Sequence, residues 1–344
     1  MSERTGGGLS RRDVLRISAA VGVAAAFGGG ASLALLRQAG MRTVRQTRSR
    51  LGTIVSISVT HPDGDAARAM VEAAFGELEA REAALTRHRP GAPLWRLNES
   101  GRLTDAPPEL THVLAEALAM AQLTGGAFDP TVLPVLDAWA DARAGGRAEP
   151  AAAAIDAARV LTNFRSVGID RDRIELGRPG MRVTLDGIAK GFVVDRTLDR
   201  LVSDGAERVL VDAGGDMAAG GGGSHRDPWT VAVEDPFGGG RPGGVVRLAG
   251  GCVATSGDYL HAFTEDRRHH HIIDPRTGCS PASASAVTVL ADSAMQADAL
   301  STALMVLGPD EGVKLAEEVD GAEVLIVDKR GARTESSGFA ITRT

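Results

Sequence analysis

Residues 268–278 read Arg268-His269-His270-His271-Ile272-Ile273-Asp274-Pro275-Arg276-Thr277-Gly278, and this stretch organises the rest of the chain. Three of the eight histidines stand in a row and run into turn chemistry, because Asp before Pro is disfavoured in the helical region and Gly closes the turn. On a strand, His269 and His271 would share a face and His270 would not. A loop so dense in polar groups is typical of a functional site, and a metal site is the first interpretation.

Length and composition describe a large globular protein. The 344 residues exceed what one hydrophobic core usually organises, so one large or two fused domains are expected. The net charge of -6 gives no reason to expect a nucleic-acid partner. Aromatic residues make up only 3%, so few side chains are available to stack on a ligand. The only lysines are Lys190, Lys314 and Lys329, which makes a lysine inside a motif notable.

The N-terminus has the pattern of an export signal. Ser10-Arg11-Arg12-Asp13-Val14-Leu15-Arg16 matches the twin-arginine motif, and the stretch from Ile17 to Leu36 is uncharged and rich in Ala and Gly. Such weak hydrophobicity favours a signal peptide over a strong membrane span, with an N-terminal anchor helix as the alternative. Residues 1–36 therefore predict use of the twin-arginine export machinery and a location in the periplasm or on the outer face of the cytoplasmic membrane.

Residues 37–50 are basic and lack periodicity, so they are interpreted as a linker, and residues 51–344 as the folded domain. Cys252 and Cys279 would meet an oxidising compartment after export. A disulfide between them is one interpretation, and two free buried thiols is the favoured one.

The pattern of elements predicts an α+β fold of mixed, mainly antiparallel sheets packed with helices, since helices and strands do not alternate regularly. Leu51–Val59 alternates apolar and hydroxyl residues, which indicates a strand with one polar face. Residues 140–158 are interpreted as a surface excursion. Helices are expected at Asp65–Leu85, Pro107–Leu123, Lys190–Leu201 and Ala294–Leu307; Ile174–Leu176 and Val183–Leu185 are expected to pair as strands, and further strands are expected at Val209–Val211, Trp229–Val233, Ala286–Leu290, Glu323–Val327 and Phe339–Thr342.

The late helix carries a candidate cation site. Asp298, Ser301 and Thr302 stand at i, i+3 and i+4, so their side chains share a helical face. A carboxylate beside two hydroxyls is an all-oxygen set that suits Mg²⁺. The alternative is a solvated polar face, but the surrounding residues are apolar nearly all round, and a buried Asp must be paired or bound.

Three glycine-containing turns are further candidates. Asp186-Gly187-Ile188-Ala189-Lys190-Gly191 opens a helix with free backbone N–H groups and one positive charge, which can bind phosphate, although it matches neither common nucleotide-binding pattern. Taken alone, Gly214-Gly215-Asp216 is better explained as a tight turn with a solvated Asp, and Thr255-Ser256-Gly257-Asp258 has the same ambiguity.

Taken together, these motifs resemble the ApbE family, the FAD:protein FMN transferases. The resemblance runs from about Leu51 to about Thr342 and is carried by six segments in the order seen in that family: residues 126–131 (Gly-Ala-Phe-Asp-Pro-Thr), 186–191, 214–216, 255–258, 271–278 and 297–303. It implies that the chain binds FAD and Mg²⁺ and moves the FMN half of FAD onto a threonine hydroxyl of a target flavoprotein, releasing AMP. The target would be periplasmic or membrane-anchored.

The resemblance also implies roles for individual residues. Mg²⁺ would be held by Asp298, Thr302 and the backbone carbonyl of Ala189, with Ser301 adjacent. The flavin nucleotide would contact Leu51, His88, Ala127, Phe128, Asp129, Asp186, Lys190 and Ile272. His271 matches the motif histidine implicated in catalysis, and His271 and Asp274 both remain candidates for the base that accepts the threonine proton. The family often has Met at the position of Leu51 and an aromatic residue, commonly Tyr, at that of His88.

Two other functions fit the same site. One is a Mg²⁺-dependent FAD hydrolase that gives FMN and AMP, with water as the acceptor. The other is a non-catalytic FAD-binding carrier. Of the three adjacent histidines only His271 falls within the motif, so a hard-oxygen site around Asp298 replaces the histidine run as the expected metal site.

Overall fold

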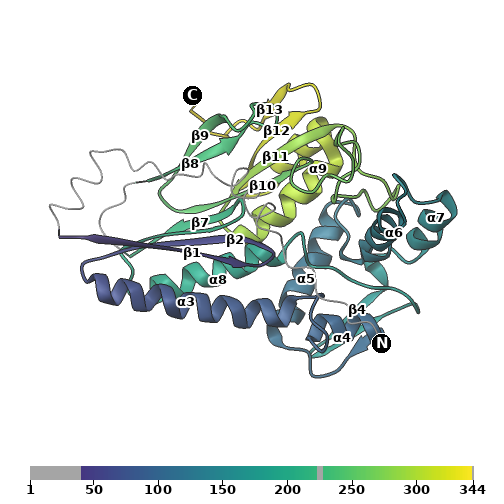
Figure 1. Ribbon diagram of the computed structural model, residues 1–344, viewed down its shortest axis with the longest axis horizontal. Coiled ribbons are helices and arrows are strands. Elements are labelled where there is room, and N and C mark those ends of the chain that lie inside the picture. Colours follow the sequence, from purple (N-terminus) through teal and green to yellow (C-terminus); the bar gives the residue numbers. More distant parts are fainter. Residues whose placement is uncertain (1–39, 223–227, 343–344) are drawn as a thin grey trace.

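An eight-stranded antiparallel sheet forms the centre of the molecule, in the strand order β1-β2-β6-β7-β10-β11-β12-β13 (Figure 1). The computed structural model describes residues 40–222 and 228–342. The strands are β1 (Arg42–Arg50), β2 (Thr53–His61), β6 (Arg208–Ala213), β7 (Asp216–Gly220), β10 (Gly251–Gly257), β11 (Ala284–Ala291), β12 (Glu323–Asp328) and β13 (Arg333–Glu335). The predicted α+β fold with antiparallel sheets is confirmed.

Both faces of this sheet are covered. Three helices pack on one face: α3 (Gly64–Leu85), α8 (Ala189–Ser203) and α9 (Ala294–Glu317). The hairpin of β8 (Trp229–Glu234) and β9 (Pro242–Leu248) packs on the other face, where Trp229 and Val246 meet Leu210 and Val253 of the sheet. Strands β6 and β11 are therefore buried almost throughout, which explains why their sequences are mostly apolar on both faces.

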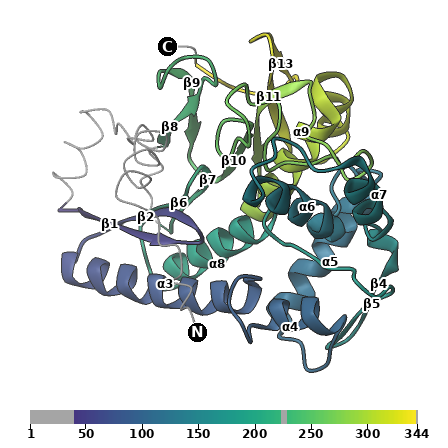
Figure 2. The same cartoon turned by 45° about the vertical axis from the view of Figure 1, so that its right-hand side comes forward.

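A second group of elements, here called the helical lobe, lies beside the sheet (Figure 2). It comprises α4 (Pro93–Ser100), β3 (Arg102–Leu103), α5 (Pro108–Leu123), η1 (Pro130–Val132), α6 (Leu133–Ala144), α7 (Ala152–Val160), η2 (Phe164–Ser166), β4 (Val167–Asp170) and β5 (Arg173–Leu176). Strands β3, β5 and β4 form a small sheet of their own. The helical lobe contacts the main layer through α5, which packs against α3 and α9.

The interpretation of residues 37–50 as a linker is wrong for Arg42–Arg50, which form strand β1 at the edge of the main sheet. The segment lacks apolar periodicity because its partner is the polar face of β2. Thr43 and Thr60 share a hydrogen bond of 2.9 Å, and Thr47 and Ser56 one of 2.6 Å. Charged residues on an edge strand also discourage pairing with other chains.

Two other local expectations are wrong. Phe339–Thr342 is not a strand, since only Thr342 forms an isolated bridge, to Val245. Val183–Leu185 is not a strand, because the side chain of Asn98 pairs with the backbone of Val183 as a neighbouring strand would. The Asn98 amide donates to the Val183 carbonyl at 2.8 Å, and the Val183 N–H donates to Asn98 Oδ1 at 2.7 Å. Strand β5 pairs with β3 and β4 instead. Residues 140–158 are mostly exposed, as expected of a surface excursion, and they include the end of α6 and most of α7.

The late helix extends beyond its predicted end. It bends at Gly308, where φ is 80°, and continues as α9 to Glu317, so the predicted boundary at Leu307 marks the bend. The predicted signal or anchor at 1–36 lies outside the described residues. Within the described residues, no helix has both the length and the apolar character needed to span a membrane. Cys252 and Cys279 are both free, but only Cys252 is buried.

Candidate active site

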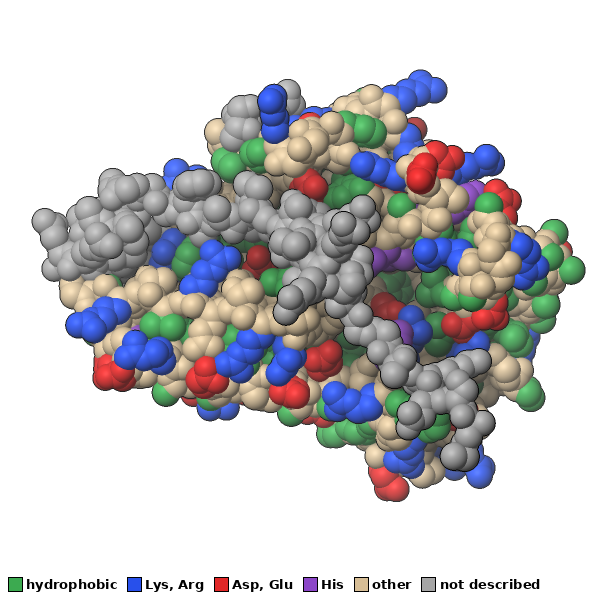
Figure 3. Space-filling model, viewed as in Figure 1, with side chains coloured by type: hydrophobic (Ala, Val, Ile, Leu, Met, Phe, Trp, Pro, Cys, Tyr) green, Lys and Arg blue, Asp and Glu red, His purple; other side chains and the backbone are tan. Residues whose placement is uncertain are grey.

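A pocket of about 670 Å³ lies where the helix-covered face of the main sheet meets the helical lobe. Its volume is in the range typical of small-molecule sites, about 300–1,000 Å³. Phe128 and Leu136 line it from the helical lobe, and Lys190, Ser256 and Thr302 line it from α8, β10 and α9. On the face drawn in Figure 3 the surface is hollowed between these two parts, and histidine side chains are visible in the hollow.

The crossing of α8 over α9 builds the charged side of the pocket. Gly191 allows the crossing, because a Cβ at this position would lie 2.2 Å from the carbonyl oxygen of Ala294. Asp195 of α8 accepts hydrogen bonds from the N–H groups of Ala294 and Met295 and so caps α9. The same close approach lets the Gly191 N–H donate to Asp298 Oδ2 at 3.0 Å.

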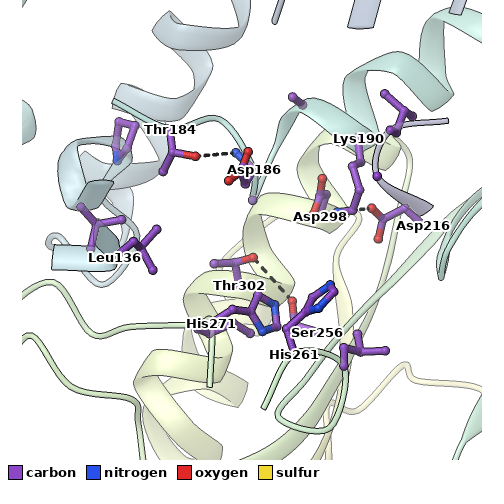
Figure 4. Close-up of a pocket in the computed structure, with 18 of the residues that line it drawn as sticks. Leu136, Thr184, Asp186, Lys190, Asp216, Ser256, His261, His271, Asp298 and Thr302 are labelled. Atoms are coloured by element: carbon purple, nitrogen blue, oxygen red, sulfur yellow. Dashed lines mark hydrogen bonds and ion pairs between the residues drawn. The ribbon is translucent and has the colours of Figure 1, made fainter. Parts of the chain in front are cut away.

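Lys190 lies between two buried carboxylates. Its Nζ is 2.7 Å from Asp216 Oδ2 and 3.2 Å from Asp298 Oδ1, as Figure 4 shows. Burial alone would lower the pKa of Lys190, but the two carboxylates outweigh burial and raise it, so the side chain stays charged. Burial, and then the charge of Asp298, raise the pKa of Asp216 to about 7. With both carboxylates ionised the cluster carries one net negative charge, which favours a cation.

Hydroxyl groups continue this oxygen-rich wall. Thr302 Oγ1 lies 3.5 Å from Ser256 Oγ, and Gly187 packs so closely against Thr302 that a Cβ would lie 3.1 Å from Thr302 Oγ1. Ser301 is fully buried behind the wall, where it bonds Ser256 Oγ at 2.8 Å and does not line the pocket. Ala189 does line it, at the first residue of α8.

The three adjacent histidines point to different places. His269 stacks on Trp139 of α6, with ring centroids 4.8 Å apart, and its Nε2 lies 2.9 Å from Glu149 Oε1. His270 is fully buried. His271 lines the pocket, and its ring meets that of His261 edge to face at a centroid distance of 5.1 Å. The described residues contain no group of three or more His, Cys, Asp or Glu side chains arranged to hold a metal.

His271 is a neutral imidazole in this setting. Burial, with smaller contributions from His261, His270 and Lys190, lowers its pKa to about 3. Its buried Nδ1 has no hydrogen-bond partner among the described residues. Asp274, the other candidate base, does not line the pocket, because its carboxylate is held by the guanidinium and backbone N–H of Arg276 at 2.9–3.0 Å. Of these two residues, only His271 lines the pocket.

The residues expected to contact the flavin nucleotide all line this pocket: Leu51, His88, Ala127, Phe128, Asp129, Asp186, Lys190 and Ile272. Leu51 and Gly52 form the β1–β2 turn with positive φ of 53° and 70°, an unusual backbone for leucine. Asp129 uses its oxygens locally, accepting from the N–H groups of Thr131 and Phe164, so it shapes its loop. Asp186 is paired with Arg87 at 2.9 Å.

Several residues that line the pocket are not identified by the sequence analysis. Asp216, Ser256 and His261 contribute to the polar wall, although Asp216 and Ser256 stand in motifs that also read as ordinary turns. Glu82 lines the pocket from the end of α3 and accepts a hydrogen bond from the Leu51 N–H at 3.0 Å. The sequence pattern that could have identified Asp216 is Gly-Gly-Asp directly after a buried strand. Glu82 and His261 stand in no motif.

Two solved structures share the fold of this chain over most of its length. The ApbE protein of Thermotoga maritima superimposes with a TM-score of 0.79 at 31% identity, over 86% of this chain and 97% of that one. The flavin transferase ApbE from Vibrio cholerae superimposes with a TM-score of 0.75 at 28% identity, over 87% and 98% of the two chains.

Sequence comparison finds proteins named FAD:protein FMN transferase. The FAD:protein FMN transferase of Haemophilus influenzae is 32% identical over 280 residues, which cover 78% of this chain and 80% of that protein. The Treponema pallidum enzyme of the same name is 33% identical over 285 residues, or 76% and 78% of the two chains. The model of the ApbE family matches residues 51–326. The chain therefore belongs to the ApbE family.

Proposed function

We propose that this protein is an FAD:protein FMN transferase, which moves the FMN half of FAD to a threonine hydroxyl of a target flavoprotein with the help of Mg²⁺ and releases AMP. The relatives that carry this enzyme name support the activity. One observation supports the chemistry: a pocket that holds Lys190 between Asp216 and Asp298 also holds the neutral imidazole of His271.

Asp298, Thr302 and the carbonyl of Ala189 are the groups that would hold Mg²⁺. All three residues line the pocket and supply only oxygen, the donor that this cation prefers. The net negative charge of the Lys190, Asp216 and Asp298 cluster also suits a cation. When bound, Mg²⁺ supplies positive charge that stabilises the diphosphate during cleavage.

The other residues bind, orient and exchange a proton. Lys190 places a permanent positive charge beside the diphosphate of FAD. His271 accepts the proton of the attacking hydroxyl. Burial lowers its pKa to about 3, and a neighbouring diphosphate would raise it, because negative charge favours the imidazolium. In Figure 4 Leu136 lies across the pocket from Lys190 and Asp216, and this apolar side suits the flavin ring system.

Incubation of the purified protein with FAD, Mg²⁺ and an acceptor domain tests the proposal. Flavin bound covalently to an acceptor threonine is the expected result, detected by mass spectrometry. Formation of FMN and AMP without an adduct would support the hydrolase, and bound FAD without either product would support the carrier. His271→Ala is expected to lower the transfer rate by at least about a hundredfold with a smaller effect on FAD binding. Equal losses of both would mean that His271 only shapes the pocket.

We further propose that the chain is exported by the twin-arginine route and that its acceptor is periplasmic or membrane-anchored. The twin-arginine pattern at residues 10–16 supports this location. Replacement of Arg11 and Arg12 by lysine is expected to keep the protein in the cytoplasm in a fractionation experiment. Unchanged export of that variant would contradict the route.

A further inference from the structure

We propose that His261 is a proton relay that carries the proton of the acceptor hydroxyl from His271 to solvent. The inference rests on the proposed transferase function and extends it to a residue outside the sequence motifs. Its basis is the position of His261, whose side chain lines the pocket, lies beside the His271 ring and is exposed to solvent.

A backbone hydrogen bond holds His261 and His271 next to each other. The N–H of His271 donates to the carbonyl of His261 at 3.1 Å, so the two residues are held across from each other within one loop. Their rings meet edge to face, with an interplanar angle of 87° and centroids 5.1 Å apart. At that separation one water molecule could bridge a nitrogen of each ring and carry the proton between them. Figure 4 shows both rings in the pocket beside Ser256 and Thr302.

The two histidines differ in their access to water. His271 is half-buried, and its buried Nδ1 has no partner among the described residues. His261 is exposed, although desolvation lowers its pKa and the charge of Lys190 adds to the effect. A proton taken up at His271 therefore has a route outward through His261. Lys190, His270 and Asp186 are the other charged or titratable groups that act on this histidine pair.

The balance of the reaction requires such a route. The threonine oxygen attacks the phosphorus of the FMN half and forms a new P–O bond, while the P–O bond to the AMP half breaks and its electron pair leaves with AMP. FAD carries two negative charges on its diphosphate, whereas the phosphodiester product carries one and AMP as a dianion carries two. One proton is thus released in each turnover, and it must pass from the pocket to solvent.

Chemical rescue tests the relay. In single-turnover transfer from FAD to an acceptor domain, His261→Ala is expected to be slower than wild type by about a hundredfold. Added imidazole is expected to restore much of the rate, because it can occupy the vacated, solvent-exposed space and carry the proton. Pyrazole, a ring of the same size but a much weaker base, is expected not to restore it. His261→Gln fills the space without titrating, so it should be slow and insensitive to imidazole.

Controls separate this role from folding and from the proposed function itself. FAD binding, followed by flavin fluorescence, is expected to be unchanged in both variants. His112→Ala is the matched control, because His112 is exposed on α5 and its ring contacts Phe192 outside the pocket, and it should keep the wild-type rate. A slow His261→Ala that imidazole does not rescue, or a variant as fast as wild type, would overturn the relay alone. Absence of any adduct with the wild-type protein would overturn the transferase function and the relay with it.

Discussion

Asp298 is bonded through both carboxylate oxygens, to Lys190 Nζ at 3.2 Å and to the Gly191 N–H at 3.0 Å. We predict that Asp298→Ala abolishes Mg²⁺-dependent turnover, because the only carboxylate of the proposed metal set is lost. The variant should also unfold more easily by about 2 kcal/mol, since the half-buried ammonium of Lys190 loses one of its two carboxylate partners. Turnover against Mg²⁺ concentration and urea unfolding measure the two effects.

Asp310→Ala is the matched control for that change, because Asp310 is exposed on the same helix. Its stability should stay within about 0.5 kcal/mol of wild type, with normal use of Mg²⁺. Full Mg²⁺-dependent activity in Asp298→Ala would remove Asp298 from the metal site.

Because of His270, we expect the protein to lose stability in mild acid. Its side chain is fully buried, and burial lowers its pKa to about 4 from an ordinary value of 6.5. The unfolded chain therefore takes up a proton at this histidine before the folded chain does. The stability present above pH 6.5 is lost as the pH falls towards 4, by up to about 1.4 kcal/mol for each pH unit.

Urea unfolding between pH 4.5 and 8 tests this expectation, since His270→Leu should make the free energy of unfolding depend less on pH. The exposed His112 serves again for comparison, because His112→Leu should leave the pH dependence as it is. An equally steep pH dependence in His270→Leu and wild type would rule out His270 as its source.

At the residue scale, the sequence identifies side chains whose chemistry depends on near neighbours in the chain. Asp298 and Thr302 share a helical face, and both line the pocket. Asp216 could not be assigned in this way, because its role depends on Lys190, which reaches it only after α8 packs on the sheet. His261 also gains its meaning from a fold contact, the ring of His271.

At the scale of helices and strands, the close crossing of α8 and α9 depends on the lack of a side chain at Gly191. We predict that Gly191→Ala destabilises the protein by about 1–3 kcal/mol or more, because the added Cβ would lie 2.2 Å from a backbone oxygen and the helices must separate. Separation also draws Lys190 away from Asp298, so transfer should slow together with the loss of stability. Thermal unfolding and transfer rate are the measurements.

Gly76 offers the opposite case. It is exposed within α3, and a Cβ added there would meet no atom within 4 Å, so Gly76→Ala should stabilise the protein by about 0.5–1 kcal/mol. If Gly191→Ala were as stable as wild type, the close crossing could not be what positions Lys190.

Helices and strands could be predicted from the sequence where one buried face gives it a regular repeat of apolar residues. Strand β2 shows its alternation because Val55, Ile57 and Val59 face the helices. Strand β1 was not predictable, because an edge strand bonded through hydroxyls needs no apolar face. The false strand at Val183–Leu185 has the reverse cause, since an apolar segment obtains its strand-like hydrogen bonds from Asn98, a residue distant in sequence.

For the whole molecule, the pocket joins the helical lobe to the main sheet, so a ligand there should stabilise both. FAD at a hundred times its dissociation constant is expected to add about 2.7 kcal/mol to the free energy of unfolding and to raise the melting temperature by about 5 °C. Mg²⁺ should add to this shift in wild type but not in Asp298→Ala. Melting curves that FAD leaves unchanged would contradict binding at this boundary.

The position of strand β1 bears on where a tag or a solid support is best attached to the protein. Its pairing places Arg50 beside Thr53 and the pocket-lining Leu51, and Arg42 at the opposite end beside His61. Nine residues of strand separate these ends by about 27 Å. An affinity tag, fluorophore or solid support joined ahead of residue 40 would thus enter the fold a full strand length from the cavity. Immobilisation through that end is the orientation that leaves the cavity accessible to an acceptor as large as a protein.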